Sequence, residues 1–319
     1  MYDSPRKILV TGAFGQIGTE LVSALQTKFG PENVVALDIY VPDSFSGIAE
    51  KFDILETDKL EACIQKYQIT EIYHLVSLLS SRGEQDPNLA WKLNIDSLKS
   101  ILDLSVKYHI KIFWPSSIAA FGPTTPRVNT PQNTILEPTT MYGVTKVAGE
   151  LLCRYYHEKF GLDVRTIRYP GLISWKQEPG GGTTDYAVAI FYDALRKDEY
   201  KCFVSADTIL PMMYMDDAIR GTLDLMSIPQ EKLFVYKPYN FAAISFRADE
   251  LAAEISKIKP ITVTYIPDDR QKIADSWPQS IDDSEARKDW GWQNNFDLHD
   301  VVKEMYAHLS EKLNKKIPT

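Results

Sequence analysis

A run of three glycines near the start of the chain, placed between an apolar strand and an amphipathic helix, most constrains the fold. We expect the strand over residues 7–10 and the helix over residues 16–29, with Gly12, Gly15 and Gly18 at the junction. The first glycine permits a tight turn, the second lets the backbone approach a pyrophosphate, and the third allows close packing of helix on strand. Free N–H groups at the start of such a helix bind phosphate oxygens. The spacing therefore predicts a dinucleotide-binding unit.

An acidic residue at the end of the next expected strand, residues 33–38, indicates which dinucleotide is bound. The Asp38 carboxylate can accept hydrogen bonds from both hydroxyls of the adenine ribose, and it would repel a 2′-phosphate. No arginine directly follows it to reverse that preference. The competing interpretation is that the glycines only make turns and Asp38 is a solvated charge. The strand–turn–helix–strand order favours NAD binding over that interpretation.

Further cofactor contacts are expected where later strands end. Asp53 follows a short strand and could meet the adenine amine, whereas His74, within an apolar strand, is interpreted as a core histidine. The predicted cofactor-binding residues are Gly12, Phe14, Gly15, Gln16, Ile17, Gly18, Asp38, Ile39, Asp53, Ile54, Leu75, Lys146 and Tyr169.

Strand and helix patterns alternate through the first half of the chain, which predicts a parallel sheet with helices on both faces. Expected strands cover residues 7–10, 33–38, 71–76, 111–115 and 164–169, with a short strand ending near 53; expected helices cover 16–29, 58–67, 87–108 and 143–159. The fold class is α/β: a Rossmann doubly wound parallel sheet with a smaller, interleaved C-terminal α/β lobe. We assign residues 1–170 to the NAD-binding domain and residues 171–319 mainly to a substrate-binding lobe.

A tyrosine and a lysine one helical turn apart, Tyr142 and Lys146, form the candidate catalytic pair. A tyrosine hydroxyl is a weak base at neutral pH, and a nearby ammonium together with the positive charge of oxidised nicotinamide would lower its pKa. Ser116 and Ser117 end an earlier strand and could hydrogen-bond the same substrate oxygen. This arrangement predicts a dehydrogenase site.

The Thr-Gly-x-x-Gly-x-x-Gly turn at 11–18 and the Tyr-x-x-x-Lys pair resemble the extended short-chain dehydrogenase/reductase superfamily over nearly the whole chain. The resemblance implies that Tyr142 is the general base, that Lys146 orients the nicotinamide ribose, and that Ser117, rather than Ser116, holds the reacting oxygen. It also implies a homodimer that pairs through the two long helices at 87–108 and 143–159.

The segments at 168–175, 179–187 and 210–214 resemble the NAD-dependent L-threonine 3-dehydrogenases of the epimerase-like branch. The resemblance implies oxidation of the 3-hydroxyl of L-threonine to 2-amino-3-oxobutyrate. Glycines 180–182 suit a loop that closes over a small polar ligand. The expected substrate-binding residues are Ser80, Ser116, Ser117, Tyr142, Gly182, Thr183, Thr184 and Trp277. The alternative is a nucleotide-sugar epimerase or dehydratase; a non-catalytic NAD sensor would not need the intact tyrosine–lysine pair.

The composition of the chain argues against several other classes of protein. A net charge of −8 argues against a nucleic-acid partner, and no apolar run is long enough for a bilayer. Three widely spaced cysteines favour a reducing compartment over disulfides, and we expect no metal site. Because no apolar signal region precedes the first strand, we expect a cytoplasmic enzyme, or alternatively one in the mitochondrial matrix after processing.

Overall fold

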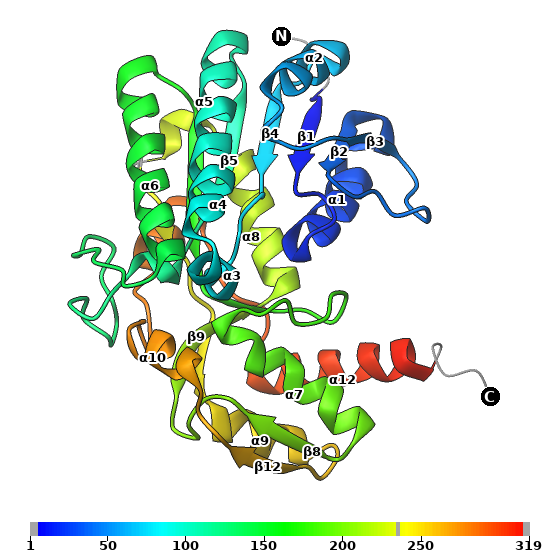
Figure 1. Cartoon of the computed structure of the whole chain (residues 1–319), viewed down its shortest axis with the longest axis vertical. Coiled ribbons are helices and arrows are strands. Elements are labelled where there is room, and N and C mark those ends of the chain that lie inside the picture. The colour runs from blue at the N-terminus through cyan, green and yellow to red at the C-terminus, as the bar shows by residue number, and fades with distance from the viewer. Residues whose placement is uncertain (1–5, 234–236, 315–319) are drawn as a thin grey trace.

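The computed structural model describes residues 6–233 and 237–314 and has two lobes, the larger at the top of Figure 1. A parallel sheet forms the centre of the larger lobe. Its strands are β1 Ile8–Thr11, β2 Val34–Asp38, β3 Ile48–Lys51, β4 Glu71–His74, β5 Lys111–Ser117, β6 Val164–Tyr169 and β10 Tyr239–Asn240. Within the described ranges these seven strands are ordered β10-β6-β5-β4-β1-β2-β3, and every neighbouring pair is parallel. The strand order reverses between β1 and β4, which is where such sheets bind ligands.

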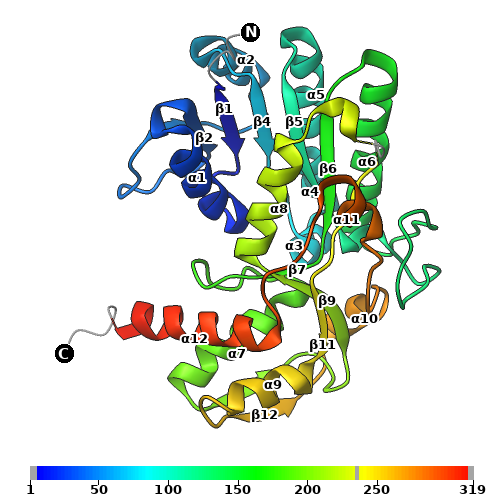
Figure 2. The same cartoon turned by 180° about the vertical axis from the view of Figure 1, so that it is seen from behind.

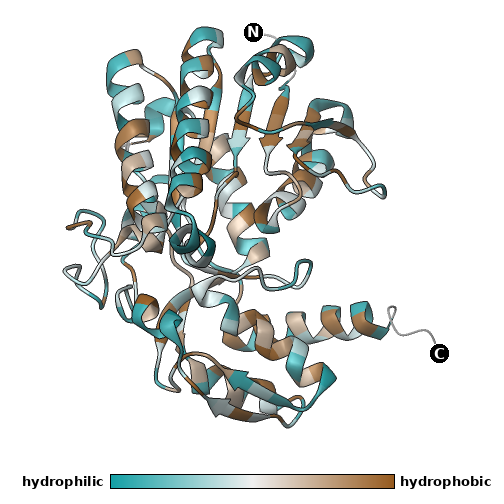
Figure 3. Cartoon of the chain, viewed as in Figure 1, coloured by the Kyte–Doolittle hydropathy of each residue, from teal (hydrophilic) through white to brown (hydrophobic). Residues whose placement is uncertain are grey.

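Helices cover both faces of this sheet because successive strand side chains point to opposite sides. The helices are α1 Gln16–Phe29, α2 Thr57–Tyr67, α5 Ser97–Tyr108, α6 Met141–Phe160 and α8 Met215–Ser227. Ile8 and Val10 belong to the apolar core that includes α1 and α8, whereas Leu9 belongs to the core that includes α2, α5 and α6. Figure 1 shows α5 and α6 in front of the sheet, and Figure 2 shows α1 and α8 in front of its other face. Figure 3 shows the apolar character of β1 and β2. The doubly wound α/β prediction is confirmed.

The smaller lobe has its own core, in which Phe191, Leu210, Leu251 and Met305 are fully buried. Its strands are β7 Gly171–Ile173, β8 Glu199–Cys202, β9 Ile209–Tyr214, β11 Ile244–Arg247 and β12 Thr262–Tyr265; its helices are α7 Tyr186–Arg196, α9 Ala248–Ser256, α10 Asp269–Asp275 and α12 Leu298–Asn314. The chain returns to the larger lobe through α8, β10 and α11 Ser284–Trp290. The two lobes are therefore interleaved, and the boundary at residue 170 stays a prediction.

Several predicted boundaries were wrong by one or two residues. The strand expected to end near Asp53 ends at Lys51, and the one expected over 71–76 ends at His74. Leu75 still donates one bond to the Thr11 carbonyl (3.0 Å), after which the chain leaves the sheet.

The helix expected over 87–108 is interrupted. It divides into α4 Pro87–Trp91, a π-helical turn Lys92–Asp96 and α5, and is preceded by the short α3 Ser80–Gln85. The sequence-based prediction did not include this π-turn. Within the described ranges, none of the helices has both the length and the apolar character needed to cross a bilayer.

Candidate active site

A cavity of about 290 Å³ lies at the carboxyl ends of β1, β4, β5 and β6, facing the smaller lobe. The glycine turn, the segment after β4, the start of α6 and the loop before α7 line it. All eight predicted substrate residues are among those that line it: Ser80, Ser116, Ser117, Tyr142, Gly182, Thr183, Thr184 and Trp277. These residues are up to about 200 positions apart in sequence. Ser116 and Ser117 end β5 at the edge of the sheet where such folds bind ligands, and α3, α6 and the smaller lobe supply the other residues.

The glycine turn has the backbone geometry that a pyrophosphate requires. Gly12 adopts a φ of +69°, and a Cβ there would lie 3.0 Å from the Val76 nitrogen. A Cβ on Gly18 would lie 2.1 Å from the Gly12 carbonyl oxygen, so the first turn of α1 packs too closely for any side chain. Helix α1 begins at Gln16 with no side chain capping its first N–H groups, and its first turn lines the cavity. These residues fit the pyrophosphate of a dinucleotide.

Asp38 lies beside this turn, at the end of β2. Its Oδ1 accepts from the N–H of Ile39 (2.8 Å) and its Oδ2 accepts from the N–H of Phe14 (3.0 Å). Each carboxylate oxygen keeps a second lone pair for a ribose hydroxyl. The carboxylate is therefore oriented by two backbone groups of the same binding unit.

The predicted cofactor residues divide into two groups. Those that line the cavity are Gly12, Gly15, Gln16, Ile17, Gly18, Leu75, Lys146 and Tyr169. Phe14, Asp38, Ile39, Asp53 and Ile54 lie outside that cavity. Asp53 accepts from the N–H of Leu55 (3.0 Å) and so shapes the turn after β3, while Ile54 is buried. Their contacts with an adenosine stay predictions.

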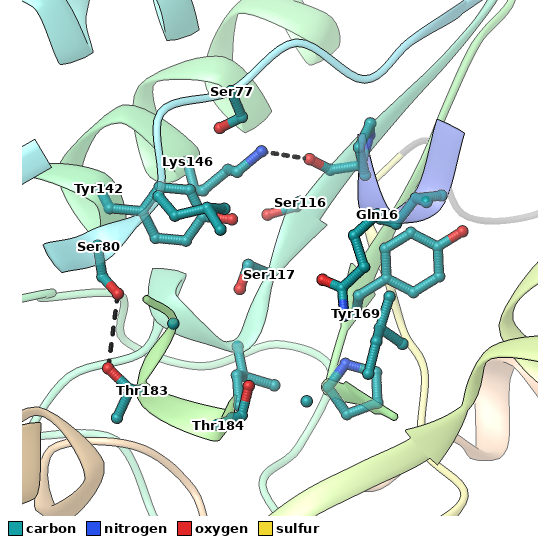
Figure 4. A pocket seen from close by; sticks show the side chains of 18 of the residues that line it. Gln16, Ser77, Ser80, Ser116, Ser117, Tyr142, Lys146, Tyr169, Thr183 and Thr184 are labelled. Atoms are coloured by element: carbon teal, nitrogen blue, oxygen red, sulfur yellow. Dashed lines mark hydrogen bonds between the residues drawn. The ribbon is translucent and has the colours of Figure 1, made fainter. Parts of the chain in front are cut away.

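Tyr142, Lys146 and Ser117 point into the same part of the cavity (Figure 4). Thr140 begins α6 by accepting the N–H of Gly143 (3.1 Å), which fixes the first turn and therefore the tyrosine. Lys146 Nζ donates to the Pro115 carbonyl (2.7 Å) and lies 5.3 Å from the centroid of the Tyr142 ring. The catalytic pair is thus anchored to β5, the strand that ends in Ser117.

Burial dominates the protonation of both members of the pair. It raises the pKa of Tyr142 to about 12, against hydrogen bonds with Ser117 and Ser77 that lower it. Burial also lowers the pKa of Lys146 to about 7, although Cys153 and Glu150 act in the opposite direction. Lys146 is not among the groups that lower the tyrosine pKa, so that part of the sequence-based expectation is not met in this structure. Hydrogen bonds from the hydroxyls of Ser117 and Ser77 lower the pKa of Tyr142 instead.

Ser116 and Ser117 have different environments because consecutive strand residues face opposite sides. The Ser116 hydroxyl is buried and donates to Glu150 Oε1 (2.5 Å). Ser117 is partly exposed to the cavity, and its hydroxyl bonds with Tyr142. Ser117 is therefore the serine that is better placed to meet a substrate oxygen.

The loop before α7 places two threonines opposite Ser80. Thr183 Oγ1 lies 3.5 Å from Ser80 Oγ, and both residues are buried (Figure 4). Asp185 Oδ2 accepts from the N–H groups of Gly181 and Gly182 (2.8 Å each), which closes the glycine segment into a defined turn. The sequence analysis missed Asp185, although an acidic residue three positions after Gly182 at a helix start is a recognisable capping signal.

Asn94 is a second residue that the sequence analysis missed. It lies in the π-helical turn, accepts from the N–H of Leu78 (2.7 Å) and donates to Thr145 Oγ1 (2.9 Å). It therefore holds the segment after β4 against the turn of α6 between Tyr142 and Lys146. A buried polar residue in a helix that breaks its hydrogen-bond ladder often marks a functional region, but only the structure reveals this break.

His74 is completely buried at the end of β4 and bridges two hydroxyls. Its Nδ1 lies 2.7 Å from Thr11 Oγ1, and its Nε2 lies 3.0 Å from Ser97 Oγ. Because Ser97 donates to the Leu93 carbonyl (2.5 Å), we infer that Nε2 carries the ring proton and that Nδ1 accepts from Thr11. Burial, with a smaller contribution from Lys146, lowers the pKa of His74 to about 3. The interpretation as a core histidine with a satisfied ring is confirmed.

Acidification is expected to destabilise the protein through His74. Its pKa is about 3 in the folded chain against an ordinary value of 6.5, so the unfolded chain binds the proton first. The free energy of unfolding therefore falls as the pH decreases from 6.5 toward 3, by on the order of 5 kcal/mol from this residue. A His74→Gln variant cannot bind that proton. Its free energy of unfolding, measured with urea at a series of pH values, should therefore fall less steeply below pH 6.5. His109→Asn, at an exposed left-handed position, is the control and should retain the wild-type slope. An unchanged slope in His74→Gln would contradict the assignment.

The model of the NAD dependent epimerase/dehydratase family matches residues 8–237. An uncharacterized epimerase/dehydratase of Staphylococcus haemolyticus is 46% identical over 316 residues, which is 97% of this chain and 99% of that protein. The chain therefore belongs to the NAD-dependent epimerase/dehydratase family.

Two solved structures show similarity to a particular enzyme of that family. The structure of a monomeric L-threonine 3-dehydrogenase from a metagenome is 50% identical with a TM-score of 0.94, covering 96% of this chain and 99% of that one. The L-threonine dehydrogenase of Phytophthora infestans is 46% identical with a TM-score of 0.94, again covering 96% of this chain and 99% of the other.

Proposed function

We propose that this chain is an NAD-dependent L-threonine 3-dehydrogenase, which oxidises the 3-hydroxyl of L-threonine to give 2-amino-3-oxobutyrate and NADH. The observation that carries the proposal is the single cavity that joins Tyr142, Ser117 and Lys146 to the hydroxyls of Ser80 and Thr183. The similarity to two such dehydrogenases along nearly the whole chain supports it.

The reacting hydroxyl lies between Tyr142 and Ser117 in this mechanism. Tyr142, as the phenolate, takes the hydroxyl proton on its Oη, and Ser117 donates a hydrogen bond to the oxygen as negative charge develops there. Lys146 holds the hydroxyls of the nicotinamide ribose. When bound, NAD would supply the hydride acceptor and a positive charge in the cavity. Because the pKa of Tyr142 is about 12 in this structure, additional positive charge is what brings it toward the working range.

The other end of the substrate meets the short hydroxyls. Ser80, Thr183 and Thr184 supply donors and acceptors for an amino acid's carboxylate and ammonium, and buried Trp277 excludes water. The cavity of about 290 Å³ must also admit the nicotinamide end of the cofactor. That leaves room for a substrate of only a few heavy atoms, which favours a small hydroxy amino acid over a nucleotide sugar.

An NADH absorbance assay tests the proposed function. Purified protein is mixed with NAD and, separately, L-threonine, D-threonine, L-serine and 3-hydroxybutyrate. We expect NADH formation to be fastest with L-threonine. Turnover of a UDP-sugar without net NADH, and no response to L-threonine, would instead identify an epimerase.

We also propose a homodimer that pairs through α4 and α6. Trp91, Leu151, Tyr155 and Phe160 present exposed apolar surface on these two helices, with exposed fractions of 41% to 53%. Leu151 and Tyr155 are four residues apart and so share one face of α6. Light scattering is expected to give twice the chain mass, and Tyr155→Glu is expected to shift it toward one chain mass. A wild-type mass of one chain would contradict this proposal.

A reducing compartment, cytoplasmic or organellar, is proposed for the protein. Cys63, Cys153 and Cys202 are all free and buried in the structure. Buried thiols without partners are typical of proteins that never meet an oxidising folding environment.

A further inference from the structure

A buried ion pair lies directly behind the catalytic residues. Arg168 on β6 donates to both carboxylate oxygens of Glu150 on α6, from Nε and Nη2, at 2.8 Å each. Ser116 on β5 donates to the same carboxylate at 2.5 Å. All three side chains are at least nine-tenths buried. One carboxylate therefore joins a helix and two adjacent strands.

The register of the sheet places this junction next to the cavity. Ser116 is paired with Arg168, and the next residues along the two strands, Ser117 and Tyr169, line the cavity. On α6, Glu150 follows Lys146 by four residues, so the two lie one turn apart on the same side of the helix. Any shift of α6 relative to β5 would change the separation of the catalytic tyrosine and lysine from the catalytic serine.

Three further segments of the chain complete the junction. Arg168 Nη1 donates to the Gln132 carbonyl (3.2 Å) and to Asn240 Oδ1 (3.1 Å), and its guanidinium lies 5.1 Å from the centroid of the Phe121 ring. Arg168 thereby uses four of its five N–H groups. The ion pair holds one geometry because its bidentate contact and its further bonds all have to be satisfied together.

We infer that Glu150 is a positioning residue for the proposed reaction: it sets α6 against β5, and its carboxylate lies one helical turn from Lys146. The expected effect of Glu150 on the rate of oxidation rests on the proposed function. Its expected effect on NAD binding does not depend on which substrate the enzyme uses. Glu150 itself touches neither the cavity floor at Ser117 nor the tyrosine hydroxyl, so it acts through Lys146 and through the strand.

The charges around Lys146 support this role. The groups facing the ammonium are Tyr142, Glu150 and Cys153 on α6, His74 on β4, and the Trp114 ring and Pro115 carbonyl on β5. Burial raises the pKa of the Cys153 thiol well above its usual range and lowers that of His74 to about 3, so both are neutral near pH 7. Glu150 is then the anion that offsets the burial of Lys146.

The test measures NAD binding by calorimetry as a function of pH, together with the steady-state rate on L-threonine. Glu150→Gln removes the charge at constant size, and Glu150→Asp keeps it. Asp163→Asn is the matched control, because Asp163 pairs with Arg165 at the opposite end of β6, at 2.8 Å. A Glu150→Gln/Arg168→Met double variant removes both charges, so that no buried ion is left unpaired if the single variant fails to fold.

For Glu150→Gln and the double variant, we expect NAD affinity to be lost at a pH lower than in the wild type, by about one unit. We expect kcat to fall about 10- to 100-fold with the KM for L-threonine within about threefold. Glu150→Asp should retain the wild-type pH profile. Equal profiles and equal kcat in a folded Glu150→Gln, or the same changes in Asp163→Asn, would overturn the inference. A wild-type protein that binds NAD but does not oxidise L-threonine would refute the proposed function alone, since the binding profiles would still test Glu150.

Discussion

Replacing Tyr142 by phenylalanine is expected to lower kcat for L-threonine oxidation by about 10²- to 10⁴-fold while NAD binding is retained. The variant removes one oxygen atom, the group beside Ser117 that takes the substrate proton in the proposed mechanism. The ring itself remains to pack at the start of α6. The measurement is single-turnover NADH formation at saturating NAD, with calorimetry for the cofactor.

A matched control for this variant is Tyr186→Phe. Tyr186 is also buried, and its hydroxyl has no hydrogen-bond partner among the described residues. Removing that hydroxyl should leave both the rate and the cofactor affinity near the wild-type values. If Tyr142→Phe also turned over at the wild-type rate, the tyrosine would have no part in proton transfer.

The second large effect is expected at Asp38. An Asp38→Asn variant should bind NADP about 10²-fold better relative to NAD, because the like-charge repulsion of the 2′-phosphate disappears and such contacts are worth several kcal/mol. The amide keeps the size of the side chain next to the backbone of Phe14 and Ile39. The dissociation constants of NAD and NADP, measured at the same ionic strength, give the ratio.

Exposed Asp43, in the loop that follows β2, provides the control for general electrostatics. Asp43→Asn changes the net charge by the same amount and should leave the ratio of the two dissociation constants unchanged. A ratio that did not change in Asp38→Asn either would rule out a contact between Asp38 and the adenine ribose.

The strands and the cofactor turn could be predicted from sequence because their causes are local. Gly12 and Gly18 occupy positions that do not accommodate a side chain: Gly12 has a φ of +69°, and a hypothetical Cβ of Gly18 would lie 2.1 Å from a backbone oxygen. The apolar runs of β1 and β2 are buried on both faces, which leaves a continuous hydrophobic signal.

The choice between the two serines could not be predicted with the same certainty. Ser116 and Ser117 are adjacent and chemically identical, and their roles differ because one faces α6 and Glu150 while the other faces the cavity. Likewise, the π-helical turn that carries Asn94 and the two-residue strand β10 have no local pattern of their own. Each depends on contacts between segments that are far apart in the chain.

The glycine turn, Asp38 and the Tyr142–Lys146 spacing were determined by the sequence alone, because backbone conformation and helical periodicity relate residues that are close in the chain. The tertiary structure decided which hydroxyls meet in the cavity and which groups surround Lys146. It also decided that the pKa of Tyr142 rises to about 12 and that of Lys146 falls to about 7. The physical reason is burial: the free energy of an ionised group depends on how much water is removed from around it and on the charges nearby. Both are set by the packing of β5, β6 and α6, and not by any residue taken alone.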